Sequence, residues 1–227
     1  MLVIGAGGLG SPVALYLASA GVGCLLLVDP DSVDLTNLQR QIAHQSSSVG
    51  RPKVESARER INGLNADVRV EAFQQRADES FLDEHVPRCH VVVDCSDNFH
   101  TRHLVNAACV RHGRPLVSGA ALGFDGQVSV YDSQSGGSCY ACLFPPGQAF
   151  EEAACATMGV FAPLVGIIGS VQAAEALKLL AGIGETLTGR LMMLDARRME
   201  WETMRVPRQP GCLVCGSARP GPTNAQG

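Results

Sequence analysis

Two pairs of closely spaced cysteines lie in the second half of the chain, Cys139 with Cys142 and Cys212 with Cys215. Two residues separate the members of each pair, which is the spacing at which two thiolates bind one metal ion in a zinc knuckle. Together the pairs supply four sulfur ligands, which fill the tetrahedral coordination of Zn²⁺ and leave no position for a catalytic water. The sequence therefore predicts a structural zinc site that ties the C-terminal segment to the loop at 139–142.

A glycine-rich segment near the N-terminus has the spacing of a nucleotide-binding loop. Gly5, Gly7 and Gly10 form a G-x-G-x-x-G pattern, and Gly8 adds one more position without a side chain. Such glycines let phosphate oxygens approach the backbone N–H groups at the start of a helix. Asp29 follows about twenty residues later, where a carboxylate can bind ribose hydroxyls. The pattern fits NAD or ATP, and it also fits a glycine turn that only packs a helix closely against a strand.

Charged residues after this loop favour a nucleoside triphosphate. The polar stretch 36–41 contains Arg40, and Lys53 follows it. Both cations could reach phosphates that lie over the glycine loop, where they would hold negative charge as pyrophosphate leaves. Two alternatives involve no nucleotide. Arg40 could pair with Asp31 or Asp34 at the surface, and Lys53 could be a solvated helix residue.

A further acidic segment, Asp94 to Asn98, follows an apolar run that is expected to form a strand. Open α/β sheets bind ligands at the carboxyl ends of their parallel strands. A carboxylate such as Asp97 could hold Mg²⁺ against triphosphate oxygens there. In the alternative interpretation Asp97 or Asn98 caps the following helix, and both roles are compatible.

The elements that must position these residues alternate between strands and helices. Apolar or alternating runs predict strands at 2–4, 24–28, 68–72, 89–95, 115–118 and 123–131, and one or two more within 190–206. Helices are expected at 11–20, 51–62, 98–112 and 161–180. We therefore predict an α/β fold, with a Rossmann-like parallel sheet in residues 1–120. Residues 121–216 would form a mixed half that extends this sheet with antiparallel strands, binds the carrier and contains the zinc site. Residues 217–227 would be a polar tail.

Composition narrows the class of protein. The 227 residues are 46% hydrophobic and 18% charged, which is typical of a globular chain. The formal charge of −4 and the lack of a long Lys/Arg run argue against a nucleic-acid partner. Residues 2–28 carry no charge, but their glycines and Pro12 favour strand, turn, helix and strand over a membrane span.

Nine cysteines are present, which is an odd number. Several of them are isolated in apolar surroundings, namely Cys24, Cys89, Cys95 and Cys109. This pattern does not match the disulfide framework of a secreted domain. It predicts a reducing cytoplasm and a metal site.

Several motifs occur in one order along almost the whole chain. They are Gly-Ala-Gly-Gly-Leu-Gly (5–10), Asn-Leu-Gln-Arg-Gln (37–41), Gly-Arg-Pro-Lys (50–53), Asp-Cys-Ser-Asp-Asn (94–98), Val-Ser-Gly-Ala (117–120), Cys-Tyr-x-Cys (139–142) and the closing Cys-x-x-Cys. In this order they resemble the ThiF/MoeB/HesA family, the bacterial relatives of ubiquitin-activating enzymes. Within the family they are most similar to the molybdopterin-synthase adenylyltransferases, followed by the thiamine sulfur-carrier adenylyltransferases.

The resemblance implies an activity and its participants. Members of the family use MgATP to adenylate the C-terminal glycine of a ubiquitin-like sulfur carrier that ends in Gly-Gly, and they release pyrophosphate. They serve molybdenum cofactor or thiamine biosynthesis in the cytoplasm as homodimers. In this sequence the resemblance places Gly8 against the nucleotide, Asp29 on the ribose and Asp97 on magnesium. It places Asn37, Arg40 and Lys53 on the phosphates, and the remaining nucleotide-binding residues would be Gly5, Gly7, Gly10, Thr36, Leu38, Gln39 and Asn98.

The resemblance also raises questions about individual segments. In some members a cysteine near Cys155 forms a covalent link to the carrier, so Cys155 is a candidate catalytic residue. Members usually carry an N-terminal segment with an arginine that reaches the neighbouring subunit's ATP site, and this sequence starts at the first strand. We therefore expect slower ATP turnover and a less stable dimer than in members that carry this segment.

Two alternatives to an active adenylyltransferase are an inactive or weakly active scaffold and an NAD-dependent oxidoreductase.

Sulfur would come from another protein, because no rhodanese-like domain follows the second cysteine pair. An external sulfurtransferase or a cysteine desulfurase is the expected donor.

Overall fold

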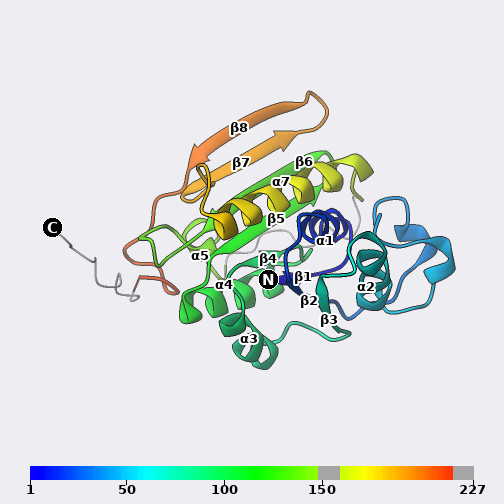
Figure 1. The fold of residues 1–227 in the computed structure, drawn as a ribbon. Helices are drawn as coiled ribbons and strands as arrows, with labels where there is room; N and C mark the ends of the chain where they lie inside the picture. The colour runs from blue at the N-terminus through cyan, green and yellow to red at the C-terminus, as the bar shows by residue number, and fades with distance from the viewer. Residues whose placement is uncertain (148–158, 217–227) are drawn as a thin grey trace.

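The computed structural model describes residues 1–147 and 159–216, whose strands form one eight-stranded sheet in the order β3-β2-β1-β4-β5-β6-β7-β8 (Figure 1). The strands are β1 (Leu2–Ile4), β2 (Cys24–Val28), β3 (Arg69–Phe73), β4 (Val92–Asp94), β5 (Leu116–Leu122), β6 (Asp125–Tyr131), β7 (Arg190–Asp195) and β8 (Glu200–Arg205). Pairing is parallel from β3 to β5 and antiparallel from β5 to β8. The predicted α/β fold, a parallel sheet extended by antiparallel strands, is confirmed.

Helices cover both faces of this sheet (Figure 1). The described helical segments are α1 (Gly10–Ser19), η1 (Leu35–Asn37), η2 (Ser46–Ser48), α2 (Lys53–Leu64), α3 (Glu79–His85), η3 (Val86–Arg88), α4 (Phe99–His112), α5 (Tyr140–Leu143) and α7 (Ala162–Ala181). The first apolar core joins α1, α2 and α7 to one face, and the second joins α3, α4 and α5 to the other. Burying both faces is what the continuous apolar runs of β1, β2 and β4 require.

The structure differs from the expected elements in two short helices and in the bounds of several strands, such as β4, which covers 92–94 rather than 89–95. The helices α3 and α5 were not predicted, because a helix of one or two turns is too short to display a 3.6-residue periodicity. The start of α3 is capped by Asp78, whose carboxylate accepts the N–H of Phe81 at 2.9 Å. The strand β5 runs to Leu122 rather than 118, because it pairs with β6 along its whole length.

The direction in which the sheet grows reverses at β1. The chain passes from β1 through α1 to β2 on one side, while β4 pairs with the other side of β1. Ile4 lies opposite Asp94 in this pairing, so the chain leaves the sheet at neighbouring points after both strands. Such a reversal opens a crevice at the carboxyl ends of the strands, where ligands of open α/β sheets bind.

Within the described residues, α7 is the helix that is long and apolar enough to cross a membrane by length and composition. It packs against α1 and the sheet, and it carries two buried polar residues that both have partners. Gln172 donates to the carbonyl oxygen of Asp94 at 2.7 Å, and Glu175 accepts the N–H of Leu187 at 2.7 Å. These features are those of a core helix. Residues 2–28 form β1, α1 and β2, as the sequence predicts.

Candidate nucleotide site and metal centre

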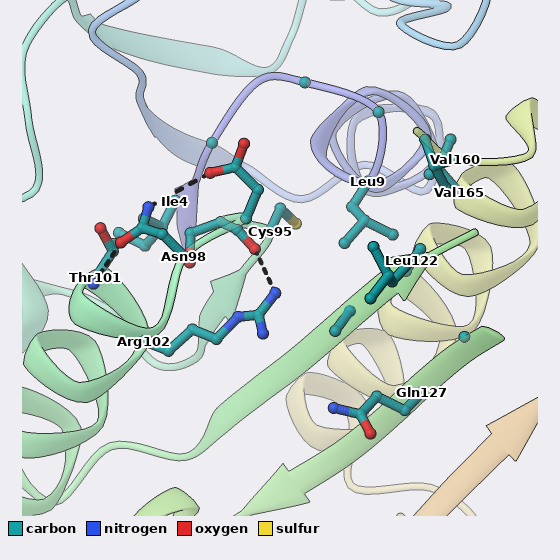
Figure 2. A pocket seen from close by; sticks show the side chains of 18 of the residues that line it. Ile4, Leu9, Cys95, Asn98, Thr101, Arg102, Leu122, Gln127, Val160 and Val165 are labelled. Atoms are coloured by element: carbon teal, nitrogen blue, oxygen red, sulfur yellow. Dashed lines mark hydrogen bonds between the residues drawn. The ribbon is translucent and has the colours of Figure 1, made fainter. Parts of the chain in front are cut away.

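An open cavity of about 1500 Å³ lies at the carboxyl ends of β1 and β4 (Figure 2). Its wall brings together many of the predicted site residues, namely Gly5, Gly7, Gly8, Asp29, Gln39, Arg40, Lys53, Asp97 and Asn98. Four other predicted site residues do not line it, namely Gly10, Thr36, Asn37 and Leu38. The cavity continues over β6, β7 and β8, so it is longer than a nucleotide site alone requires.

The glycine loop closes so tightly that two of its glycines are required by packing. Gly5 has a φ of +93°, and a Cβ there would lie 2.9 Å from the carbonyl oxygen of Cys95. A Cβ on Gly10 would lie only 2.0 Å from the carbonyl oxygen of Gly5. Gly7 and Gly8 line the cavity, and so does Gly5. Close packing and an open backbone surface therefore coexist in one loop. The interpretation as a nucleotide-binding loop and the interpretation as a tightly packed glycine turn are compatible.

Substituting Gly10→Ala is expected to lower the free energy of unfolding by about 3 kcal/mol or more, because the methyl group would overlap a backbone oxygen. The matched control is Gly63→Ala, inside α2, where an added Cβ meets no atom within 4 Å. That control should stabilise the protein by about 0.5–1 kcal/mol, the helix propensity gain. Urea unfolding of both variants checks this, and an unchanged midpoint for Gly10→Ala would contradict the packing described.

The peptide of Ala6, within the loop, is held from both sides. Its N–H donates to Asp29 Oδ2 at 2.7 Å. Its carbonyl oxygen contacts His44 Nε2 at 2.8 Å, and a carbonyl can only accept, so Nε2 carries the proton. His44 Nδ1 then accepts the hydroxyl of Ser56 at 3.0 Å. Burial raises the pKa of Asp29, and the charge of Lys53 opposes that rise.

His44 predicts a pH dependence of stability. Burial lowers the pKa of its imidazole below the ordinary value of 6.5. The unfolded chain therefore takes up a proton at a higher pH than the folded chain, and the free energy of unfolding falls as the pH drops below 6.5. Thermal unfolding at pH about 7.5 and about 5.5 should show a smaller loss of Tm in His44→Gln than in the wild type. The exposed His90→Gln should behave like the wild type. Equal losses in all three proteins would contradict this account.

The two predicted cations occupy different environments. The side chain of Lys53 is only 6% exposed, and its Nζ lies 2.9 Å from Asp31 Oδ2. The alternative in which Lys53 is a solvated helix residue is therefore wrong. Arg40 does not pair with Asp31 or Asp34 at the surface; its Nη2 donates to Asn37 Oδ1 at 2.9 Å. Asp34 accepts instead from Thr36. Both cations line the cavity.

The segment after β4 is fixed by a buried acid at its start. Asp94 is fully buried, and its Oδ1 accepts both the N–H and the hydroxyl of Ser96 at 3.0 and 2.7 Å. Burial raises the pKa of Asp94, while Arg102 and these hydrogen bonds oppose that rise. Asn98 caps α4 by accepting the N–H of Thr101 at 2.8 Å (Figure 2), so the capping interpretation is confirmed for this residue. Asp97 is left exposed at the wall of the cavity.

The two cysteine pairs meet at the end of α4, and all four Sγ atoms lie within 4.8 Å of one another. Three neighbouring Sγ pairs are 3.4–3.9 Å apart. A zinc ion with four sulfur ligands at about 2.3 Å requires Sγ atoms roughly 3.8 Å apart. A disulfide would bring two of them to about 2.05 Å. The cluster therefore fits a tetrahedral metal ion and contains no disulfide.

The electrostatics of the cluster also fit a cation. Burial raises the pKa of Cys215 to about 11 and places that of Cys139 well above its ordinary value. Burial would raise the pKa of Cys212 too, but the N–H groups of Cys215 and Val214 outweigh it and lower the pKa to about 7. Four thiolates cannot share this volume without a compensating positive charge. A divalent metal ion such as Zn²⁺ would supply that charge.

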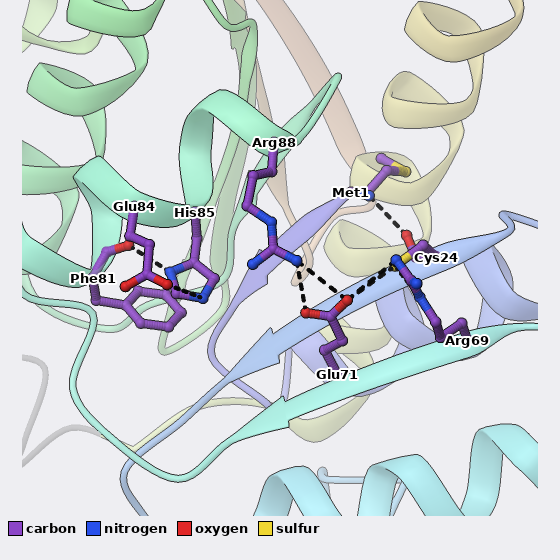
Figure 3. A network of polar contacts seen from close by, with 8 residues as sticks. All are labelled: Met1, Cys24, Arg69, Glu71, Phe81, Glu84, His85 and Arg88. Atoms are coloured by element: carbon purple, nitrogen blue, oxygen red, sulfur yellow. Dashed lines mark hydrogen bonds and ion pairs between the residues drawn. The ribbon is translucent and has the colours of Figure 1, made fainter.

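The remaining described cysteines lie outside the cluster. Cys89, Cys95 and Cys109 are buried, as expected. Cys24 differs, because it is partly exposed and its Sγ accepts from the guanidinium of Arg69, which also pairs with Glu71 at 3.2 Å (Figure 3). Cys155 falls outside the described residues.

Sequence reasoning missed three polar residues at the site. His44, Arg102 and Gln172 are at least nine-tenths buried, and they bond the backbone carbonyl oxygens of Ala6, Ser96 and Asp94, respectively. Arg102 carries a detectable signal, because it lies four residues after the cap Asn98 and thus above it on α4. Gln172 carries none, since its partner is distant in sequence and its helix is otherwise apolar.

Comparisons with known proteins agree with this geometry. The sequence profile of the ThiF family matches residues 1–214. The sulfur carrier protein ThiS adenylyltransferase of Escherichia coli K12 is 46% identical over 98% of this chain and 88% of its own. The molybdopterin-synthase adenylyltransferase of the same strain is 44% identical over 95% of this chain and 86% of its own.

Among solved structures, the crystal structure of E. coli MccB with ATP superimposes with a TM-score of 0.83 at 25% identity. That match covers 95% of this chain and 66% of the MccB chain.

Proposed function

Because the chain belongs to the ThiF family, we propose that it is an adenylyltransferase that uses ATP to activate the C-terminal glycine of a ubiquitin-like sulfur carrier protein. The observation that carries the proposal is the cavity at the carboxyl ends of β1 and β4, which is lined by the glycine loop, Asp29, Arg40 and Lys53. Relatives of nearly equal identity are named for ThiS and for molybdopterin synthase. We therefore propose the carrier class, in thiamine or molybdenum cofactor biosynthesis, without choosing between the two.

The reaction joins a carboxylate to AMP. One oxygen of the carrier's terminal carboxylate attacks the α-phosphorus of ATP and forms a new P–O bond. The bond from the α-phosphorus to the oxygen that bridges to the β-phosphate breaks, and pyrophosphate leaves with that electron pair. Negative charge thus grows on the departing pyrophosphate, and fixed cations beside it lower the barrier. Arg40 and Lys53 are the cations that we assign to this task.

The other residues bind and orient the nucleotide. We assign the backbone of Gly5, Gly7, Gly8 and Gly10 to the phosphates, following the packing of that loop. Asp29 would bind the ribose with the lone pairs that remain after its oxygens accept the N–H groups of Ala6 and Asp31. The segment from Thr36 to Gln39 would shape the cavity beside Arg40, with Asn37 orienting the Arg40 guanidinium.

Two metal ions belong to the proposal. Asp97 presents an exposed carboxylate at the cavity wall beside Asn98, and hard oxygen ligands of this kind fit Mg²⁺. When bound, Mg²⁺ would neutralise charge on the triphosphate. The four clustered cysteines would hold Zn²⁺ in a closed structural site.

The remaining partners follow from the resemblance. We propose that the protein is a cytoplasmic homodimer that does not bind nucleic acid. A separate sulfurtransferase or cysteine desulfurase would deliver the sulfur. Residues 1–120 would bind the nucleotide and residues 121–216 the carrier. Cys155 remains a candidate for a covalent link to the carrier.

Intact-mass spectrometry tests the proposed product. The purified chain is incubated with MgATP and a sulfur carrier ending in Gly-Gly. The carrier is expected to gain the mass of one AMP group. A matched carrier ending in Gly-Ala controls for attachment elsewhere. A carrier whose mass stays unchanged under conditions in which ATP binds would contradict the proposal.

A further inference from the structure

One buried side chain at the wall of the cavity leaves its carbonyl oxygen unpaired. Gln41 is 4% exposed and lines the cavity, and within the described residues its Oε1 has no hydrogen-bond partner. Buried polar atoms are nearly always paired in folded proteins, because an unpaired one loses its hydration without compensation. A residue that breaks this rule at the wall of a binding cavity points to a ligand.

The turn that carries Gln41 is held by its backbone. The N–H of Gln41 donates to the carbonyl oxygen of Asn37 at 3.1 Å, and the carbonyl oxygen of Gln41 accepts the N–H of His44 at 3.0 Å. The imidazole of His44 in turn bonds the carbonyl oxygen of Ala6 at 2.8 Å. The turn is therefore fixed against the glycine loop, and it needs no hydrogen bond from the Gln41 carboxamide.

This carboxamide lies directly beside Gly7. A Cβ on Gly7 would be 3.4 Å from Gln41 Nε2 and 4.0 Å from Gln41 Cδ, so the amide nitrogen is the nearer atom. Gly7 also lines the cavity, in the loop that we assign to the phosphates. An amide nitrogen carries two N–H donors, and phosphate oxygens are strong acceptors. The side chain therefore matches a phosphoryl oxygen that lies over Gly7.

We propose that Gln41 is a further nucleotide-binding residue, whose Nε2 donates a hydrogen bond to a phosphoryl oxygen of ATP beside Gly7. Arg40 and Lys53 supply positive charge to the same cavity, whereas Gln41 supplies neutral donors at a fixed position. Because the turn is already tied to the glycine loop, little conformational entropy is lost when the ligand binds. This inference rests on the proposed function, since it takes ATP as the ligand of the cavity.

Gln41→Met tests the contact, because methionine has a similar length but no N–H donor. In calorimetric titrations of the full 227-residue chain, the Kd for ATP with Mg²⁺ should rise about 10- to 100-fold, the effect of one hydrogen bond to a charged group. The Kd for adenosine, which has no phosphate, should change by less than about twofold, well below one such bond. Without ligand, the Tm should equal or exceed that of the wild type, because the substitution removes a buried unpaired oxygen.

Gln41→Glu keeps the shape of the side chain but replaces its donors with negative charge, so it should weaken ATP binding more than Gln41→Met does. The matched controls are Gln45→Met and Gln45→Glu. Gln45 lies four residues further along the chain, is exposed and does not line the cavity. Both controls should bind ATP within about twofold of the wild type, although Gln45→Glu changes the net charge equally, because an exposed charge is screened by water and salt.

Nitrogen–proton correlation NMR observes the contact directly. The side-chain NH₂ signals of Gln41 are identified as the pair that is missing from Gln41→Met. In the wild type, this pair should move downfield in the proton dimension when ATP is added, and it should not do so with adenosine. A pair that stays in place when ATP is bound would overturn the inference, and so would an equal movement with adenosine.

The binding data give two further grounds for rejection. A Gln41→Met protein with the wild-type Kd for ATP would overturn the inference. A protein with a lowered Tm and equal losses for ATP and adenosine would show that Gln41 only supports the fold. A wild-type chain that binds no ATP would instead contradict the proposed function, so the two failures are distinguishable.

Discussion

Replacing Lys53 by alanine is expected to lower the rate of carrier-dependent ATP–pyrophosphate exchange by about 10²–10³-fold, the usual cost of removing one fixed charge-stabilising group from an active site. The Lys53 side chain is buried at the cavity, where it faces little competition from water. Its partner Asp31 is 64% exposed and is rehydrated when the lysine is lost. The fold should therefore survive, and the loss should fall on the chemical step.

Arg51→Ala is the matched control for this variant. Arg51 lies two residues away and is also cationic, but its side chain is 47% exposed and pairs with Glu59 at 2.6 Å. Exchange in Arg51→Ala should stay within about twofold of the wild type, since an exposed ion pair contributes little. If both variants lost activity equally, or Lys53→Ala kept the wild-type rate, the role assigned to Lys53 would be refuted.

Cys212→Ser should abolish zinc binding and lower the free energy of unfolding by about 4 kcal/mol, the stabilisation from a ligand present at roughly 1,000 times its Kd. For a chain of this size, that loss corresponds to a fall in Tm of about 10 °C. The physical reason is that three sulfurs cannot complete the tetrahedron. The C-terminal segment then loses its link to α5.

Cys24→Ser separates this effect from the removal of any thiol. Cys24 lies in β2, outside the cluster, where it is partly exposed. We expect this control to retain one zinc ion per chain, with a Tm within about 2 °C of the wild type, a change of less than about 1 kcal/mol. Elemental analysis and thermal unfolding measure both quantities. A Cys212→Ser protein with full zinc content and full stability would show that the cluster is not a closed four-sulfur site.

Most of the fold follows from local patterns in the sequence. The runs at 2–4 and 24–28 are so short and apolar that only buried strands accommodate them, and their bounds match the structure. The alternation over 123–131 marks a strand of the antiparallel part and becomes β6. The cysteine spacing predicts the cluster because each pair occupies one turn, whatever the chain does between the pairs.

The sequence could not show which buried side chains support the site. His44 and Gln172 bond carbonyl oxygens that are 38 and 78 residues away, so no local pattern announces them. The burial of Lys53 has the same origin, because it depends on where Asp31 lies after the chain folds. Long-range contacts of this kind depend on the packing of several elements at once, whereas a strand or a knuckle is defined within a few residues.

The most direct test of adenylation is ATP–pyrophosphate exchange by the purified chain, with and without a ubiquitin-like carrier that ends in Gly-Gly. The account predicts exchange that depends on the carrier and on Mg²⁺, because pyrophosphate can re-form ATP only from an enzyme-bound carrier adenylate. A chain that binds ATP, zinc and the carrier but catalyses no exchange would contradict the account.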